Sequence, residues 1–161
     1  MSTQRNNLSN YDNTSIPDAT DYKIGVVISE WNSQVTKCLL EGVLHTLKNF
    51  GVHSNNIVVQ YVPGSFELIF GAKKLQTTAV DAVIAVGCII QGETKHFDYV
   101  CQGVTQGIKD LNVLYDTPVI FCVLTDNNLQ QSLDRSGGKY GNKGVEAAVT
   151  ALKMVALNKS L

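Results

Sequence analysis

The sequence is short of charge, and the charge that it has is balanced. Only 17% of its 161 residues are Asp, Glu, Lys or Arg, and the formal net charge is −1 at pH 7. There is neither a basic excess nor a long run of Lys or Arg. Proteins that bind nucleic acid need such a basic patch to meet the phosphates, so we expect no nucleic-acid partner.

Long hydrophobic runs are also missing. No stretch reaches the roughly 18 apolar residues that a membrane span needs. Residues 1–21 are rich in Ser, Thr, Asn and Asp, without the apolar run of about 7–15 residues found in a secretory signal. We therefore expect a soluble, cytoplasmic protein with no membrane partner. Residues 1–21 are expected to form a flexible tail before a single domain at residues 22–161.

The four cysteines and three histidines form no recognisable metal or redox motif. Cys38, Cys88, Cys101 and Cys122 make no CxxC or CxxH pair, and each lies in or beside an apolar stretch. This placement is typical of buried thiols in a reducing compartment. Neither GxxxxGK[ST] nor GxGxxG occurs, so neither a nucleoside triphosphate nor a dinucleotide is indicated.

The sequence does contain four short apolar runs, each followed by hydrophobic residues at helical spacing. Runs that are apolar throughout are typical of parallel strands covered on both faces, and strand–helix alternation predicts right-handed crossovers. We therefore expect an α/β fold of three layers, with a four-stranded parallel sheet flanked by helices. The expected strands are residues 23–29, 57–62, 82–90 and 119–124, and the expected helices are residues 35–50, 68–79, 97–111, 129–135 and 145–156.

Candidate functional residues follow the carboxyl ends of the expected strands, where ligands gather in open parallel sheets. Trp31 follows the first strand, and residues 63–67, 91–96 and 125–127 follow the others. Trp31, the only tryptophan, could stack on a planar ring or could cover the sheet edge. Asp126 or Asn127 is expected to cap the short helix that follows the fourth strand.

Residues 92–94 open a helix, and the free N–H groups of a helix start suit an anion such as phosphate. The same residues also fit a plain turn in which Thr94 caps the helix. His96 lies in the first helical turn, where the helix dipole favours the neutral base. It could act in acid–base catalysis or be an ordinary surface histidine.

A second possible anion site combines Arg135 with Lys143 across a glycine-rich connection, residues 136–144. A guanidinium and an ammonium on such a loop suit anion capture. A solvated connection with incidental charge is the alternative.

Three of these motifs together resemble the lumazine synthase family in order and spacing. They are PGSFEL at residues 63–68, GETKHFDYV at 92–100, and Arg135 followed by GNKG at 141–144. The resemblance runs from about Tyr22 to the C-terminus. It implies a flavodoxin-like domain and an enzyme that needs no cofactor and no metal. The implied reaction, the penultimate step of riboflavin biosynthesis, condenses 5-amino-6-(D-ribitylamino)uracil with 3,4-dihydroxy-2-butanone 4-phosphate. Its products are 6,7-dimethyl-8-ribityllumazine, phosphate and water.

The resemblance also implies roles for individual residues. His96 resembles a proton donor, Lys143 a lysine near the phosphate and the ketone, and Arg135 a partner of the phosphate. Gln91 stands where the family usually has Lys or Arg, which weakens the local positive field. The implied substrate-binding set is Trp31 on the uracil ring; Cys88, Ile89 and Ile90 on the uracil edge; Ser65, Phe66 and Glu67 on the ribityl chain; Glu93 and Thr94 on the phosphate; and Phe121 and Arg135 from a neighbouring subunit.

The family further implies a homo-oligomer, either a pentamer or a shell of sixty subunits. The short glycine-rich connection between Arg135 and Val145 resembles the shell-forming members, so we expect the shell. Two other functions remain open. A flavodoxin-like protein that only binds a flavin or a lumazine would not need His96, Arg135 and Lys143 together. A purely structural shell subunit would not turn over substrate.

Overall fold

The structure, a computed structural model, describes residues 7–12, 14 and 16–161. The rest of the expected tail, residues 1–6, 13 and 15, lies outside the described residues. Four strands form one parallel sheet, which confirms the predicted architecture: β1 (Ile24–Ser29), β2 (Ile57–Val62), β3 (Ala82–Ile90) and β4 (Val119–Asp126). Their spatial order is β2-β1-β3-β4.

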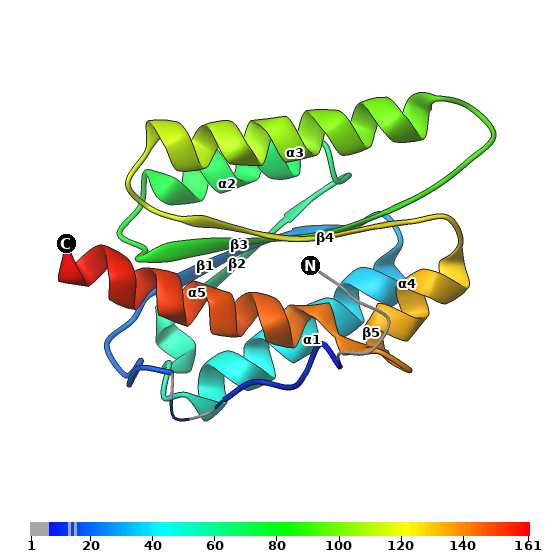
Figure 1. Cartoon of the computed structure of the whole chain (residues 1–161). Helices are drawn as coiled ribbons and strands as arrows, with labels where there is room; N and C mark the ends of the chain where they lie inside the picture. The colour runs from blue at the N-terminus through cyan, green and yellow to red at the C-terminus, as the bar shows by residue number, and fades with distance from the viewer. Residues whose placement is uncertain (1–6, 13, 15) are drawn as a thin grey trace.

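Helices cover both faces of this sheet (Figure 1). On one face lie α2 (Leu68–Gln76) and α3 (His96–Leu114), and on the other lie α1 (Ser33–Asn49), α4 (Leu129–Arg135) and α5 (Lys143–Ser160). Every residue of β1 is buried, and so is every residue of β3 except its last, Ile90. Burial of these apolar strands between two helical layers is the main force that holds the three layers together.

The edge strand β2 differs from the expectation of strands covered on both faces. Its residues are only half buried or exposed, and Val58 and Tyr61 keep 41% and 56% of their surface. β2 pairs with β1 alone, so fewer elements cover it than the central strands. A short 3-10 helix, η2 (Ser54–Asn56), leads into it.

Ends of four of the five helices differ from the predicted ones; α3 and α5, for example, run on to Leu114 and Ser160. α2 ends at Gln76, because the hydroxyls of Thr77 and Thr78 donate to the carbonyls of Lys74 and Leu75 and close the last turn. The predicted cap of α4 was wrong. Asn128 caps it by accepting a hydrogen bond from the Gln131 N–H at 3.0 Å, whereas Asp126 still belongs to β4.

The glycine-rich connection folds into a small antiparallel hairpin that the sequence did not predict. Its strands are β5 (Ser136–Gly138) and β6 (Gly141–Asn142). Gly137 and Gly141 take φ values of 125° and 82°, a region that favours glycine. Asn142 then starts α5 by accepting a hydrogen bond from the Gly144 N–H at 2.7 Å. The hairpin therefore fixes where Lys143 enters the last helix.

The described part of residues 7–21 contacts the domain. Leu8 and Ala19 are buried. The Leu8 N–H donates to the Tyr140 carbonyl at 2.8 Å, and the Ala19 N–H donates to the Phe50 carbonyl at 3.2 Å. Across the described ranges, no helix is both long enough and apolar enough to cross a bilayer.

Candidate active site

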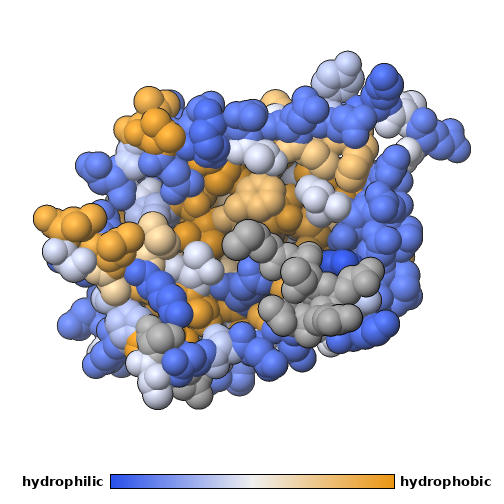
Figure 2. All heavy atoms as spheres, viewed as in Figure 1, coloured by the Kyte–Doolittle hydropathy of each residue, from blue (hydrophilic) through white to orange (hydrophobic). Residues whose placement is uncertain are grey.

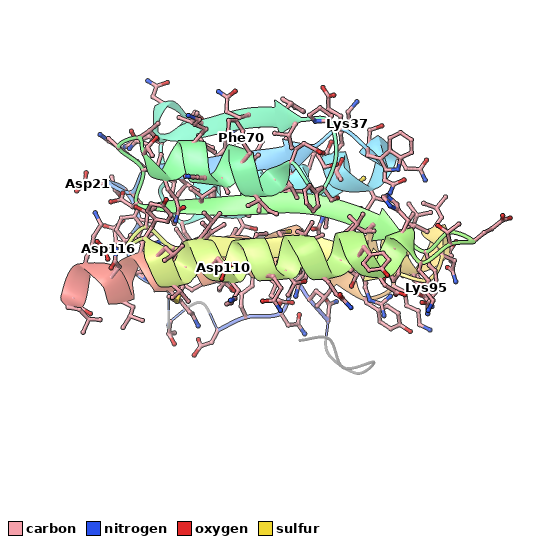
Figure 3. The ribbon with its side chains drawn as sticks, turned by 90° about the horizontal axis from the view of Figure 1, so that it is seen from above. Asp21, Lys37, Phe70, Lys95, Asp110 and Asp116 are labelled. Atoms are coloured by element: carbon pink, nitrogen blue, oxygen red, sulfur yellow. The ribbon has the colours of Figure 1, made fainter. Side chains whose placement is uncertain are left out.

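A cavity of about 680 Å³ lies at the carboxyl ends of the strands. In Figure 3 the strand arrows point to the end of the molecule where Lys37 and Lys95 are labelled. Strand order reverses between β1 and β3, and such a reversal is where doubly wound sheets bind ligands. The volume suits a small-molecule substrate. The lining residues are Trp31, Asn32, Gly64, Ser65, Phe66, Glu67, Cys88, Ile89, Ile90, Gly92, Thr94, His96, Phe97, Tyr99 and Val100.

The turn after β1 presents Trp31 to the cavity. Asn32 has φ 56° and ψ 44°, the one positive φ outside glycine among the described residues. Asparagine tolerates this left-handed conformation better than most residues. The Asn32 Nδ2 donates to the Cys88 carbonyl at 3.0 Å, and the Trp31 N–H donates to the Pro63 carbonyl at 3.2 Å. The turn is thus tied to two other elements, while the Trp31 side chain remains 71% exposed.

The loop between β2 and α2 packs closely on its neighbours through two glycines. A Cβ at Gly87 would lie 2.8 Å from Leu68 Cδ1 and 2.9 Å from Ser65 Oγ. A Cβ at Gly103 of α3 would lie 2.7 Å from Phe66 Cε2. The absence of these Cβ atoms lets Ser65 approach β3 and the Phe66 ring rest against α3. The loop therefore forms one wall of the cavity.

The beginning of α3 forms another wall. His96 lies in its first turn, as predicted, and is its first residue; its backbone N–H donates to Thr94 Oγ1 at 3.3 Å. The N-cap of α3 is Lys95, so Thr94 lies just before the helix; its hydroxyl accepts this hydrogen bond, and the residue also lines the cavity. A Cβ at Gly92 would meet nothing within 4 Å, so the backbone is open towards an anion at this point. Glu93 is exposed and does not line the cavity.

Three lining residues on α3 were given no role in the predictions: Phe97, Tyr99 and Val100. Asn32, Gly64 and Gly92 also line the cavity and lie in the segments that follow the predicted strands, but only Gly92 was given a role, in the turn that suits an anion. Tyr99 and Val100 lie three and four residues after His96, so the helical repeat could have identified them. Asn32 directly follows Trp31, but its tie to Cys88 joins positions 56 residues apart. Nothing in the local sequence signals that contact.

Charge in the cavity does not match a phosphate. Among the described lining residues there is no Lys or Arg, and Glu67 adds a carboxylate. The Cys88 thiol is neutral near pH 7, because burial and the nearby Asp126 raise its pKa, while hydrogen bonding with Ser132 and Asn32 opposes the shift. A phosphate in this cavity would have only backbone N–H groups, hydroxyls and His96 as partners. The described lining therefore offers an anion no full positive charge.

The remaining predicted residues, Phe121, Arg135 and Lys143, do not line this cavity. Arg135 ends α4, and its Nη1 donates to the Gln131 carbonyl at 2.9 Å. Lys143 begins α5, and its Nζ lies 2.6 Å from Glu146 Oε1. Phe121 lies on β4, the edge strand opposite β2. Figure 2 shows the face along this edge, with hydrophobic side chains gathered in its middle and hydrophilic ones around them.

Comparison with known proteins shows where this arrangement belongs. The profile of a family described as 6,7-dimethyl-8-ribityllumazine synthase matches residues 21–159. A protein of that name from Flavobacterium johnsoniae is 61% identical over 160 residues, which cover 99% of this chain and 84% of the relative. Another from Christiangramia forsetii is 60% identical, with 99% of this chain and 96% of the relative covered. A third, from Parabacteroides distasonis, is 60% identical, with 96% and 98% covered.

The family model and the relatives cover nearly the whole chain. The cavity where the strand order reverses agrees with this match. The chain therefore belongs to the 6,7-dimethyl-8-ribityllumazine synthase family and is an enzyme of riboflavin biosynthesis.

Proposed function

We propose that the cavity binds both substrates of lumazine formation and that a neighbouring copy of the chain completes it. The observation that carries this proposal is the division of the predicted site. Most of its residues line one cavity, whereas its two cations, Arg135 and Lys143, lie elsewhere on the chain. The substrates are 5-amino-6-(D-ribitylamino)uracil and 3,4-dihydroxy-2-butanone 4-phosphate.

The ribitylamino-uracil fits the part of the cavity between Trp31 and β3. The exposed indole of Trp31 offers a flat surface on which the uracil ring stacks. The end of β3, from Cys88 to Ile90, offers backbone groups to the polar edge of the ring. Ser65, Phe66 and Glu67 form the wall next to it and accept the ribityl chain through the hydroxyl, the ring edge and the carboxylate.

The butanone phosphate fits the other part, at the beginning of α3. Its phosphate meets the open backbone at Gly92 and the hydroxyl of Thr94, with Glu93 beside them. These groups carry no full positive charge, so Arg135 and Lys143 of the neighbouring subunit supply it. Phe121 of that subunit covers the apolar side of the substrates. Since Gln91 is uncharged, this chain depends on these two cations more strongly than a relative with Lys or Arg at that position.

The chemistry then needs positioning and proton transfer only. The primary amine of the uracil attacks the ketone and one water leaves as the imine forms. Phosphate is then eliminated, and the second nitrogen closes the ring with loss of a second water. His96 donates and accepts the protons, since it is the first residue of α3 and lines the cavity. Holding two reactants together contributes up to about 7–11 kcal/mol, and a positioned acid–base group typically adds about 10²–10⁴-fold.

The kinetic test follows lumazine absorbance after the purified protein is mixed with the two substrates. We expect clear acceleration over the uncatalysed condensation, with phosphate released in step. His96→Ala should lower kcat about 10²-fold or more without abolishing turnover, because the positioning of the substrates remains. Arg135→Ala should chiefly raise KM for the butanone phosphate.

The matched control is His45→Ala, because His45 is exposed on α1 and its Nε2 lies 2.9 Å from Asn49 Nδ2, away from the cavity. It should leave both constants unchanged. Unchanged turnover in His96→Ala would remove His96 from the mechanism. No acceleration from folded wild-type protein would instead favour a protein that only binds a flavin or a lumazine.

The assembly that we propose is a pentamer, with the sixty-subunit shell as its further state. Large apolar side chains on α3 support an interface, since Tyr99, Val113 and Leu114 are 69%, 74% and 71% exposed. Surfaces of this kind usually mark contacts between proteins. Sedimentation velocity should show a particle of about sixty chains, and a run with pentamer alone would contradict the shell. Because Cys38, Cys88, Cys101 and Cys122 are all free thiols, we place the enzyme in a reducing cytoplasm.

A further inference from the structure

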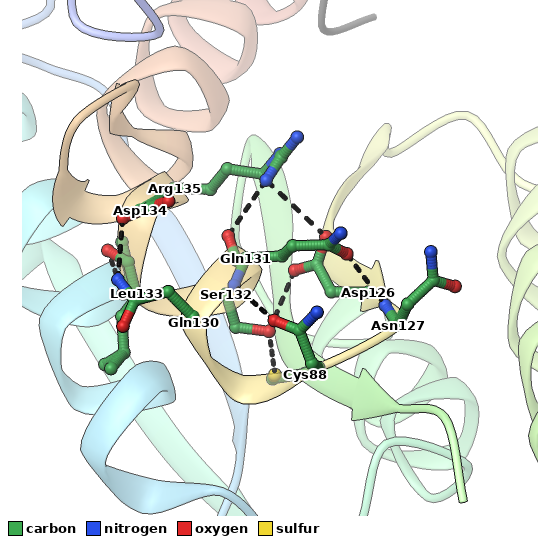
Figure 4. Close-up of polar contacts among 11 residues, drawn as sticks. Cys88, Asp126, Asn127, Gln130, Gln131, Ser132, Leu133, Asp134 and Arg135 are labelled. Atoms are coloured by element: carbon green, nitrogen blue, oxygen red, sulfur yellow. Dashed lines mark hydrogen bonds and ion pairs between the residues drawn. The ribbon is translucent and has the colours of Figure 1, made fainter.

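The guanidinium of Arg135 is held in place from three directions. Its Nη1 donates to the Gln131 carbonyl at 2.9 Å and lies 3.9 Å from Asp126 Oδ1. The centre of the guanidinium also lies 5.1 Å from the centroid of the Tyr140 ring. Figure 4 shows Nη1 between the Gln131 carbonyl and the Asp126 carboxylate. Both polar contacts use the same nitrogen, which leaves Nη2 and Nε, within the described part of the chain, for an anion.

Asp126 is itself fixed from the opposite side. It is the last residue of β4 and only 8% exposed. Its Oδ2 accepts the hydroxyl hydrogen of Ser132 at 2.8 Å, and the Cys88 thiol donates to that hydroxyl oxygen at 3.4 Å. The backbone carbonyl of Asp126 accepts the Gln91 N–H at 3.0 Å. Asp126 is therefore anchored at two points, its carboxylate by Ser132 and its backbone by Gln91.

The direction of the hydrogen bonds supports a fixed carboxylate. Burial raises the pKa of the Cys88 thiol, so near neutral pH the thiol keeps its proton and acts as the donor. Ser132 then donates its own proton to Asp126, and Asp126 accepts. Thiol, hydroxyl, carboxylate and guanidinium form one chain from the wall of the cavity to the cation of α4 (Figure 4).

A carboxylate beside a phosphate-binding arginine has a cost. It cancels part of the positive charge that the phosphate would meet, and its own burial is unfavourable unless it is paired. If Arg135 acted only through its charge, an uncharged residue at position 126 would serve better. In the observed arrangement, the carboxylate lowers the net positive charge but holds the planar guanidinium of Arg135 in one orientation. Binding of a phosphate through two hydrogen bonds depends on that orientation.

We propose that Asp126 is a positioning residue for the condensation reaction, which orients Arg135 so that its free donors meet the phosphate of the butanone substrate. This inference rests on the proposed role of Arg135. Asp126 itself touches no substrate and acts through the arginine.

The test is Asp126→Asn, which removes the charge and keeps the shape and an oxygen for Ser132. We expect KM for the butanone phosphate to rise about tenfold, the effect of a misplaced binding group. KM for the ribitylamino-uracil should stay within about twofold, since that substrate is bound at the Trp31 side. In an Arg135→Ala background, the same substitution should have no further effect on either KM, because nothing is left to orient.

Asp134→Asn is the matched control. It makes the same chemical change on α4, next to Arg135 in sequence, but Asp134 Oδ1 accepts from Gln130 Nε2 at 2.9 Å. Both KM values should remain those of the wild type. Should Asp126→Asn fail to fold, Ser132→Ala serves as the second variant. It removes the hydroxyl that anchors Asp126 Oδ2 and should raise KM for the butanone phosphate by a smaller factor.

The possible outcomes distinguish the positioning role of Asp126 from the proposed role of Arg135. An equal rise in both KM values, an unchanged KM for the phosphate substrate, or an effect that persists without Arg135 would each overturn the positioning role. A fall in KM would overturn it as well, since it would show that Asp126 weakens the positive charge. If Arg135→Ala alone leaves KM for the phosphate substrate unchanged, the proposed role of Arg135 itself fails.

Discussion

At the scale of single residues, the backbone carbonyl oxygen of Cys88 joins two segments that line the cavity. It accepts the Asn32 amide at 3.0 Å and lies 3.5 Å from the Ser65 hydroxyl. The thiol of the same residue faces the other way, towards Ser132. One residue near the end of β3 therefore contacts the turn after β1, the loop after β2 and the middle of α4. Small changes here should act on all three.

A second buried thiol, that of Cys122, leads to a prediction about how the stability of the fold depends on pH. Burial raises the pKa of Cys122 to about 12, with Lys143 opposing the shift and Glu146 adding to it. The folded protein thus holds this proton more tightly than the unfolded chain, whose thiol ionises near pH 9. The stabilisation is complete below about pH 9 and is lost as the pH rises to about 12. The free energy of unfolding should fall by up to about 1.4 kcal/mol per pH unit from this group alone.

Urea unfolding at pH 8 and pH 11 checks this. Cys122→Ala should be less stable at pH 8, because it leaves a small cavity, but it should lose less stability between the two pH values than the wild type. Equal losses would show that the buried thiol does not contribute to the alkaline sensitivity.

Single residues could be predicted from the sequence when their environment is local. Trp31 follows a strand and His96 begins a helix, and both are recognisable from neighbouring residues alone. The roles of Asn32 and Asp126 depend on partners in other elements, Cys88 and Arg135. Such contacts exist only once the chain has folded, so no local pattern could indicate them.

The close contact between α1 and α5 is the feature that matters most at the scale of elements. A Cβ at Gly144 would collide with the carbonyl oxygen of Leu39, and one at Gly42 would lie 2.7 Å from Asn142 Oδ1. The absence of both side chains lets the two helices and the hairpin between β5 and β6 pack together. This packing sets the position of Lys143, which follows the hairpin directly.

Gly144→Ala should therefore destabilise the fold by about 1–3 kcal/mol, because a backbone carbonyl cannot move aside as a side chain can. This cost outweighs the gain of up to about 1 kcal/mol that alanine usually brings to a helix. Thermal unfolding measures the difference. Gly92→Ala is the control, since its Cβ would meet nothing within 4 Å, and its Tm should stay near that of the wild type. A Gly144→Ala protein as stable as the wild type would show that the helices can separate at no cost.

The strands were predictable because they are continuous apolar runs, and the helices because their apolar residues repeat at helical spacing. The predicted bounds of β2, β3 and α4 agree with the structure. The hairpin at residues 136–142 was missed because glycines carry no side-chain pattern and because β6 has only two residues. The cap at Asn128 was missed because β4 extends through Asp126, two residues further than the apolar run.

At the scale of the whole molecule, the residues that we propose for the site lie in two different places. One half is the cavity at the ends of β1 and β3, with no Lys or Arg in its described lining. The other half, with Phe121, Arg135 and Lys143, lies along β4 and the elements that follow it. In the pentamer that we propose, each cavity would meet the second set of residues from its neighbour, which would give every subunit one complete site.

Subunit mixing tests this division most directly. His96→Ala disables the cavity half and Arg135→Ala the other half, so assemblies of either variant alone should have little activity at low concentrations of the butanone phosphate. When the two variants are co-assembled in equal amounts, about one site in four combines an intact cavity with an intact arginine from the adjacent subunit. We predict that lumazine formation then recovers to about a quarter of the wild-type rate. If the mixed assemblies are no more active than the average of the two variants, His96 and Arg135 must act within one chain, and a site shared between subunits is contradicted.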